Sequence, residues 1–184
     1  MLKDRNIALI GFRATGKSTV GKMLAHRLGL VFLDMDEHLV ASFGRDIDCY
    51  VRSRGWEAFR DEESRLLAAL ASRRGMVVAT GGGVVLDPAN RRILKEHFFV
   101  VWLTASPDII HARLVNDPGT VSNRPALTAL PLREEIEHLL RERSGLYRES
   151  ADLVLSTEDH SARDLTDILC SRLSDLNTSG RRDF

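Results

Sequence analysis

Residues 7–24 read IALIGFRATGKSTVGKML, and the pattern of this stretch decides the fold. Its first four residues are all apolar, which is typical of a strand buried on both faces. From Lys17 onward, the apolar residues Val20, Met23 and Leu24 recur at helical spacing. The stretch therefore predicts a buried strand, a loop bounded by glycines and a helix, in that order.

The loop between this strand and this helix runs from Gly11 to Ser18 and fits the pattern G-x-x-x-x-G-K-[ST]. In such a loop the backbone N–H groups cradle phosphate oxygens, aided by the N-terminus of the helix. Lys17 can reach the outer phosphates, and the Ser18 hydroxyl can ligate Mg²⁺. A chance glycine-rich turn would not need a buried strand before it and a helix after it. The sequence therefore predicts a site for a nucleoside triphosphate with Mg²⁺.

The size and charge of the chain exclude some classes of function. Its 184 residues fit one domain, which we expect to span residues 1–175, with a disordered polar tail at 176–184. Basic and acidic residues number 26 each, so no attraction to nucleic acid or to an anionic membrane is expected. We find no apolar run long enough to span a membrane and no signal peptide. Cys49 and Cys170 have no metal-site spacing, and we expect both to be buried thiols in a cytoplasmic protein.

Short apolar runs alternate with helical stretches, which is typical of a parallel sheet with helices on both faces. The predicted strands are residues 6–10, 31–34, 76–79, 98–103 and 152–155. The predicted helices are residues 16–28, 37–43, 46–53, 56–73, 88–96, 106–115, 132–148 and 161–175. Residues 116–131 interrupt this pattern with a Pro, Gly, Asn, Ser and Thr-rich loop, which is typical of a lid. The sequence therefore predicts an α/β fold, a three-layer α/β/α sandwich with a mobile lid.

Two carboxylates follow the second predicted strand, in the sequence FLDMDEHL. Ligands of open α/β sheets gather outside the carboxyl ends of the strands, so Asp34 and Asp36 are expected to face the phosphate loop. One carboxylate there can hold Mg²⁺ through water, and the other can receive a proton from an attacking hydroxyl. Taken alone, Asp36 is equally compatible with capping the helix predicted from Glu37.

Further polar residues and glycines are suited to a small anionic ligand. Arg60 and Glu63 share a helix face, although this spacing is also that of a surface ion pair. Gly81–Gly83 follow a buried strand, and a tight turn alone needs fewer glycines, so a ligand touching bare N–H groups is expected. Arg124 lies in the predicted lid, where an arginine can close on phosphates. Arg143 lies on an amphipathic helix, where spacing alone favours a solvated face.

Together these motifs resemble the shikimate kinases, in the nucleoside-monophosphate-kinase branch of the phosphate-loop enzymes. The resemblance spans about residues 6–173 and is carried, in order, by GFRATGKST, DMD, GWEAFRDEE, ATGGGVVL, NRPAL and RERSGLY. It implies a five-stranded parallel sheet in the order 2-3-1-4-5. It also implies transfer of the γ-phosphoryl group of ATP to the 3-hydroxyl of shikimate, on the route through chorismate to aromatic amino acids. The implied cofactor is Mg²⁺, and the implied partners are ATP and shikimate. Apart from the resemblance, we expect a cytoplasmic monomer.

The resemblance also implies a role for each residue that matches a family motif. The implied ATP-binding residues are Gly11, Ala14, Thr15, Gly16, Lys17, Ser18, Thr19, Arg113 and Arg124, with Arg113 against the adenine. The implied metal-binding residues are Ser18 and Asp34. The implied shikimate-binding residues are Asp36, Arg60, Glu63, Gly81, Gly82, Gly83 and Arg143, with the two arginines on the carboxylate. The implied catalytic residues are Lys17, Asp36 and Arg124.

The chain departs from the family pattern at two places, and two other functions are compatible with part of it. Ala14 stands where many members carry a glycine, and the segment between Arg113 and Arg124 looks longer than in compact members. A related kinase acting on gluconate is one alternative, although the three glycines and the F-R-x-x-E motif favour shikimate. A non-catalytic nucleotide-binding module is the other, and the presence of Lys17 and Asp36 argues against it.

Overall fold

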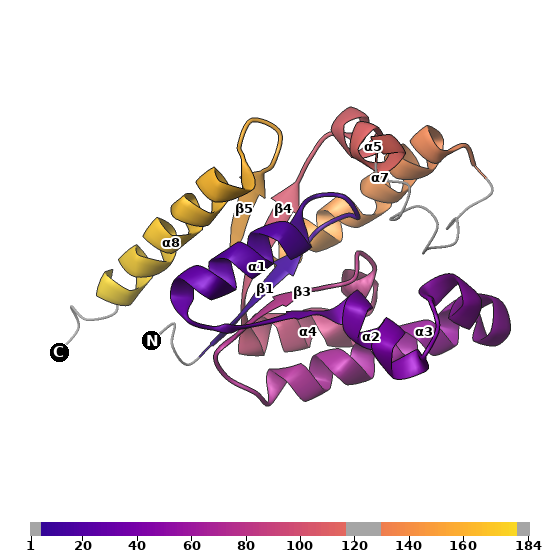
Figure 1. Ribbon diagram of the computed structural model, residues 1–184, viewed down its shortest axis with the longest axis horizontal. Coiled ribbons are helices and arrows are strands. Elements are labelled where there is room, and N and C mark those ends of the chain that lie inside the picture. Colours follow the sequence, from indigo (N-terminus) through magenta and orange to yellow (C-terminus); the bar gives the residue numbers. More distant parts are fainter. Residues whose placement is uncertain (1–4, 117–129, 180–184) are drawn as a thin grey trace.

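The computed structural model describes residues 5–116 and 130–179, which form a parallel sheet between layers of helices (Figure 1). The strands are β1 (Asn6–Ile10), β2 (Val31–Asp34), β3 (Met76–Ala79), β4 (Phe98–Thr104) and β5 (Leu153–Ser156). They pair in the order β2-β3-β1-β4-β5, and every pairing is parallel. The predicted fold class and strand order are therefore confirmed.

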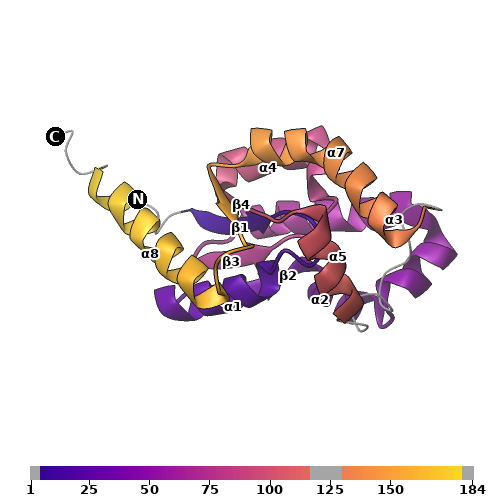
Figure 2. The same cartoon turned by 90° about the horizontal axis from the view of Figure 1, so that it is seen from above.

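Helices cover both faces of the sheet. They are α1 (Lys17–Leu28), α2 (Met35–Phe43), α3 (Ile47–Ala71), the 3₁₀ turn η2 (Val84–Leu86), α4 (Pro88–His97), α5 (Pro107–Asn116), α7 (Leu132–Ser150) and α8 (Ala162–Ser179). Figure 2 shows α1 and α8 on one face and α3, α4 and α7 on the other. The helices α2 and α5 lie beyond the carboxyl ends of the strands, beside the phosphate loop.

The central strand β1 shows why the first apolar run is continuous. Ile7 and Leu9 pack into a core with apolar side chains of α1 and α8, whereas Ala8 and Ile10 pack into a second core with α3, α4 and α7. Because successive side chains of a strand point to opposite faces, both sets must be apolar when both faces are covered. The loop that follows β1 is thus anchored at the centre of the sheet.

The structure differs from the predicted elements at several points. The two helices predicted at 46–53 and 56–73 form one element, α3, which is interrupted at Gly55 by non-helical dihedral angles (φ 85°, ψ 164°). Helix α8 continues to Ser179, whereas the helix predicted there ends at residue 175. The sequence gives a reason, because Leu176 continues the helical spacing of the leucines before it.

The two cysteines are not both buried as expected, since Cys49 is exposed and Cys170 is partly buried. The side chain of Cys49 is exposed because it lies on the face of α3 that points away from the core, in the first turn after the N-cap Asp46. Residues 117–129, and with them most of the predicted lid and Arg124, lie outside the described residues. Among the helices that are described, none has both the length and the apolar character needed to cross a bilayer.

Candidate active site

The phosphate loop closes around its own lysine. Lys17 donates from Nζ to the carbonyl oxygens of Gly11 at 2.9 Å and of Phe12 at 2.8 Å. Gly11 (φ 137°) and Gly16 (φ 84°) have the positive φ that glycine tolerates best. A Cβ at Gly11 would also lie 2.3 Å from the carbonyl oxygen of Leu103, so no larger residue fits there. Both glycines of the motif are therefore required by the backbone path of the loop.

The backbone of the phosphate loop at Ala14 has a conformation that glycine tolerates better than alanine. The φ of Ala14 is 61°, and it is the one residue other than glycine with positive φ in the described part of the chain. This conformation costs an L-residue roughly 1–2 kcal/mol. The carbonyl of Ala14 accepts a hydrogen bond from Arg113 Nη1 at 3.2 Å, and Arg113 also binds Thr157 through Oγ1 at 2.9 Å and through its carbonyl at 2.6 Å. Arg113 thus ties α5 to the phosphate loop and to the residue after β5.

Ser18 and Asp34 lie in direct contact at the end of β2. Ser18 Oγ donates to Asp34 Oδ2 at 2.5 Å, and Asp34 Oδ1 accepts from the backbone N–H groups of Asp36 at 2.9 Å and Glu37 at 3.3 Å. Asp34 is therefore the N-cap of α2, and the alternative that Asp36 caps this helix is wrong. Among the described His, Cys, Asp and Glu residues, no group of three or more is placed to hold a metal ion. One hydroxyl and one carboxylate nevertheless fit Mg²⁺, which keeps several waters and takes few protein ligands.

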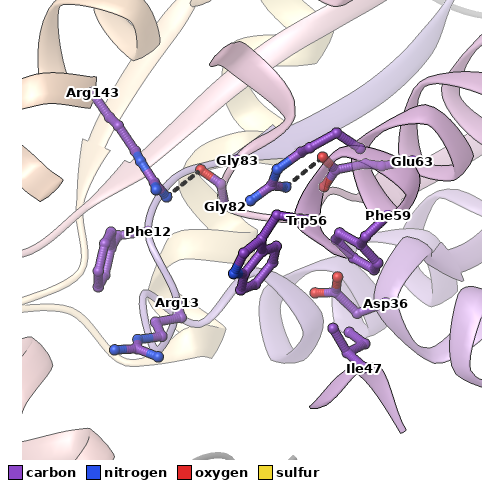
Figure 3. A pocket seen from close by; sticks show the side chains of 12 residues that line it. Phe12, Arg13, Asp36, Ile47, Trp56, Phe59, Glu63, Gly82, Gly83 and Arg143 are labelled. Carbon is purple, nitrogen blue, oxygen red and sulfur yellow. Dashed lines mark hydrogen bonds and ion pairs between the residues drawn. The ribbon is translucent and has the colours of Figure 1, made fainter. Parts of the chain in front are cut away.

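Two adjoining pockets lie at the carboxyl ends of the strands. The larger is lined by residues 13–20 of the phosphate loop and α1, together with Asp34 and Arg113. The smaller, shown in Figure 3, is lined by Phe12, Arg13, Asp36, Ile47, Trp56, Phe59, Arg60, Glu63, Gly81, Gly82, Gly83 and Arg143. Asp36 and Arg13 line both pockets. Asp36 therefore stands where a group bound in one pocket meets a group bound in the other.

Arg60 and Glu63 form a partly buried ion pair in the smaller pocket rather than a pair on the open surface. Arg60 Nη1 donates to Glu63 Oε2 at 2.6 Å, and the Glu63 side chain is 1% exposed. The rings of Trp56 and Phe59 lie 5.3 and 5.4 Å from Arg60 Cζ. Burial raises the pKa of Glu63, and the nearby Arg60 charge offsets part of this. The other carboxylate oxygen, Oε1, is buried and has no hydrogen-bond partner among the described residues, so it has capacity for a ligand hydroxyl.

Arg143 points into the same pocket from the opposite side to Glu63 (Figure 3). It is 5% exposed, so the solvated face favoured by its spacing is wrong. Its Nη1 donates to the carbonyl of Gly82 at 3.4 Å, and within residues 5–116 and 130–179 its buried Nε has no hydrogen-bond partner. A guanidinium with an unused donor in a pocket is suited to an anionic ligand.

Neighbouring side chains explain why Gly81 and Gly83 have no side chain of their own. A Cβ at Gly81 would lie 2.0 Å from Glu63 Oε1, and a Cβ at Gly83 would lie 2.3 Å from the Arg60 guanidinium. The sequence predicted that close approach of a ligand explains these glycines. In the structure, Glu63 and Arg60 approach these positions so closely that a Cβ at either one would displace the neighbouring side chain.

Several residues that line the smaller pocket or support it were not found from the sequence. Arg13 forms an ion pair with Glu135 of α7, and both side chains are almost fully buried. Tyr147 of α7 donates from its hydroxyl to the carbonyl of Gly82 at 2.5 Å. Both contacts join segments that are distant in the chain, and no spacing pattern reports such a contact. For Trp56 and Phe59 the sequence did contain a signal of pocket lining, since these two aromatic residues closely precede Arg60 in one helical stretch.

Comparison with known proteins gives a consistent result. A family model described as shikimate kinase matches residues 13–174. The shikimate kinase of Syntrophus aciditrophicus (strain SB) is 40% identical over 177 residues, which is 92% of this chain and 91% of that protein. The shikimate kinase of Rhodopirellula baltica is 37% identical over 184 residues, which is 100% of this chain and 97% of that protein. Among solved structures, shikimate kinase from Acinetobacter baumannii in complex with shikimate has a TM-score of 0.86 and 34% identity, covering 99% of this chain and 97% of that one.

Proposed function

The chain belongs to the shikimate kinase family, and its activity is the transfer of a phosphoryl group from ATP to shikimate; on this premise we propose which residues perform the reaction. The observation that carries the proposal is the pair of adjoining pockets with Asp36 lining both. ATP occupies the larger pocket and shikimate the smaller. The acceptor is the 3-hydroxyl of shikimate, as the resemblance implies.

The phosphates of ATP bind to the phosphate loop. Backbone N–H groups from Ala14 to Thr19 surround them at the N-terminus of α1, which favours negative charge. Lys17 exchanges its bonds to the Gly11 and Phe12 carbonyls for phosphate oxygens, which are better acceptors for an ammonium group. Arg113 lies on the wall of this pocket beside Thr157, which supports its assignment to the adenine end of the nucleotide.

Ser18 and Asp34 bind the Mg²⁺ ion that accompanies ATP. Their oxygens are adjacent, and both line the larger pocket. Asp34 is held in place because its second oxygen caps α2. When bound, Mg²⁺ neutralises charge on the phosphate oxygens. The chain's own contribution is to fix one hydroxyl and one carboxylate beside the phosphate loop.

Arg60 and Arg143 bind the carboxylate of shikimate. They come from different helices, α3 and α7, and each presents a guanidinium to the smaller pocket. A guanidinium offers two parallel N–H donors that match the two oxygens of a carboxylate. Glu63 orients Arg60 through their ion pair, and Glu63 Oε1 accepts a hydrogen bond from a hydroxyl of the ring. These contacts align the polyol with the end of the phosphate chain.

In the reaction, the 3-hydroxyl oxygen attacks the γ-phosphorus in line with the bond to the bridging oxygen. That bond breaks, ADP leaves with its electron pair, and the hydroxyl proton passes to Asp36. Because the transition state is loose, most of the catalysis comes from alignment and from positive charge on the γ-phosphoryl oxygens. Lys17 supplies such charge, and we assign the same role to Arg124.

We also propose that the enzyme works as a cytoplasmic monomer on small molecules, without nucleic acid or membrane partners. The equal number of acidic and basic residues, 26 each, supports this setting.

Arginine-to-lysine variants test the carboxylate assignment. Arg60→Lys, Arg143→Lys and the double variant should each bind shikimate about ten- to a hundredfold more weakly, because one charge-assisted hydrogen bond contributes roughly 1.5–3 kcal/mol. Affinity for ADP, measured by the same calorimetry, should stay unchanged. The two losses should be non-additive, since both act on one carboxylate. Normal shikimate affinity in either single variant would show that this arginine does not bind the carboxylate. Release of ADP by the unmodified protein with gluconate, and not with shikimate, would refute shikimate as the acceptor.

A further inference from the structure

The hydroxyl of Tyr147 lies where α7, the three glycines and the phosphate loop meet. Tyr147 is 0% exposed, and its hydroxyl donates to the carbonyl of Gly82 at 2.5 Å. Gly82 in turn packs on the phosphate loop, because a Cβ added there would lie 3.5 Å from Gly11 O and 3.6 Å from Arg13 N. One carbonyl group therefore stands at the contact between the nucleotide pocket and the acceptor pocket.

The same carbonyl has a second donor, Arg143, and the two donors are unequal. The bond from Arg143 Nη1 is 3.4 Å long, near the limit of a hydrogen bond, whereas that from Tyr147 is short. Tyr147 and Arg143 are one turn apart on the same face of α7. Because Tyr147 satisfies the Gly82 carbonyl, the Arg143 guanidinium does not have to, and Arg143 Nε has no hydrogen-bond partner in the part of the chain that the structure describes.

Packing and burial keep the Tyr147 hydroxyl in place as a donor. Its ring stacks on Trp102, with centroids 5.7 Å apart and an interplanar angle of 26°. Burial raises the pKa of Tyr147 to about 12, although the neighbouring Arg143 charge acts in the opposite direction. The hydroxyl thus keeps its proton at every pH at which the phosphoryl transfer is expected to run.

We propose that Tyr147 is a positioning residue for the acceptor: by holding the Gly82 carbonyl, it leaves the Arg143 guanidinium free to bind the carboxylate of the acceptor. This inference rests on the proposed function, in which Arg143 binds that carboxylate. Without the hydroxyl, Arg143 is the remaining donor to a buried carbonyl that is costly to leave unpaired. The guanidinium then turns toward Gly82 and loses part of its alignment with the ligand.

The test is Tyr147→Phe, which removes one oxygen atom and keeps the ring. Calorimetry measures the binding of shikimate, of its carboxamide (the carboxylate replaced by a neutral amide) and of ADP. We expect shikimate to bind about three- to tenfold more weakly, the equivalent of one hydrogen bond. The carboxamide should change less than twofold, because it lacks the charge and the paired oxygens that Arg143 recognises. Affinity for ADP should not change.

Trp102→Phe is the matched control, because it weakens the packing of the Tyr147 ring and leaves the hydroxyl in the protein. It should lower the Tm without changing the preference for shikimate over the carboxamide. Equal weakening of both ligands by Tyr147→Phe, or of neither, would overturn the positioning role. If the unmodified protein already binds both ligands equally, the proposed carboxylate site itself fails, and the inference fails with it.

Discussion

Replacing Gly83 with alanine perturbs the acceptor pocket through a single steric contact. The added Cβ would lie 2.3 Å from Cζ, Nη1 and Nη2 of Arg60. The backbone at Gly83 (φ −102°, ψ 0°) is accessible to alanine, so the substitution adds no strain of its own. The guanidinium is the end of the long Arg60 side chain, which is 27% exposed, so this group can move while the fold stays intact.

The size of the movement follows from the contact distance. Ordinary van der Waals contact between such atoms is about 3.5 Å, so the guanidinium must shift by roughly 1 Å or more. A shift of this size disrupts the 2.6 Å bond to Glu63 and the alignment of Arg60 with the shikimate carboxylate. Loss of one charge-assisted hydrogen bond corresponds to roughly 1.5–3 kcal/mol, so shikimate should bind about ten- to a hundredfold more weakly.

Calorimetric titration with shikimate and with ADP measures this effect, and Gly145→Ala provides a matched control. Gly145 lies inside α7, and a Cβ there would meet no atom within 4 Å. That variant should keep normal shikimate affinity and gain about 0.5–1 kcal/mol of stability, because alanine is the better helix former. Unchanged shikimate affinity in Gly83→Ala, or an equal loss of ADP affinity, would refute the steric reasoning.

Three other substitutions test the remaining assignments. Lys17→Ala should abolish measurable ADP release with shikimate while the protein stays folded, and near-normal turnover would show that the phosphate-loop assignment is wrong. Asp36→Asn should lower kcat far more than ATP affinity, because Asp36 lies where the two pockets meet; equal losses would indicate a structural role. Burial raises the pKa of Glu63 above its ordinary value of 4.5, so the folded state binds this proton more tightly than the unfolded state. Stability in urea should therefore fall as pH rises above about 4.5, and Glu63→Gln should lack this component; parallel pH profiles would contradict the raised pKa.

The acceptor pocket could be predicted only in part. Arg60, Glu63 and the three glycines each stand in a recognisable local motif, and the structure brings them to one pocket. The structure adds a reason for two of these glycines that no local pattern shows, because side chains of α3 approach Gly81 and Gly83 in space. Capping of α2 by Asp34 rather than Asp36 likewise depends on where β2 ends, which spacing leaves open by two residues.

By itself, the sequence determined the phosphate loop, the five strands and the positions of most helices. Residue type reports a local backbone requirement, such as the positive φ of Gly16, and periodicity reports which faces of an element are buried, as in the alternation of Ile7 and Ala8 along β1. Tertiary structure decided that Arg143 is buried and that Tyr147 binds Gly82, 65 residues away. The physical reason is that burial and hydrogen-bond partners are set by whichever segment packs against a helix face. For the face of α7 that carries Arg143 and Tyr147, that segment includes Gly82, and no pattern within α7 identifies it.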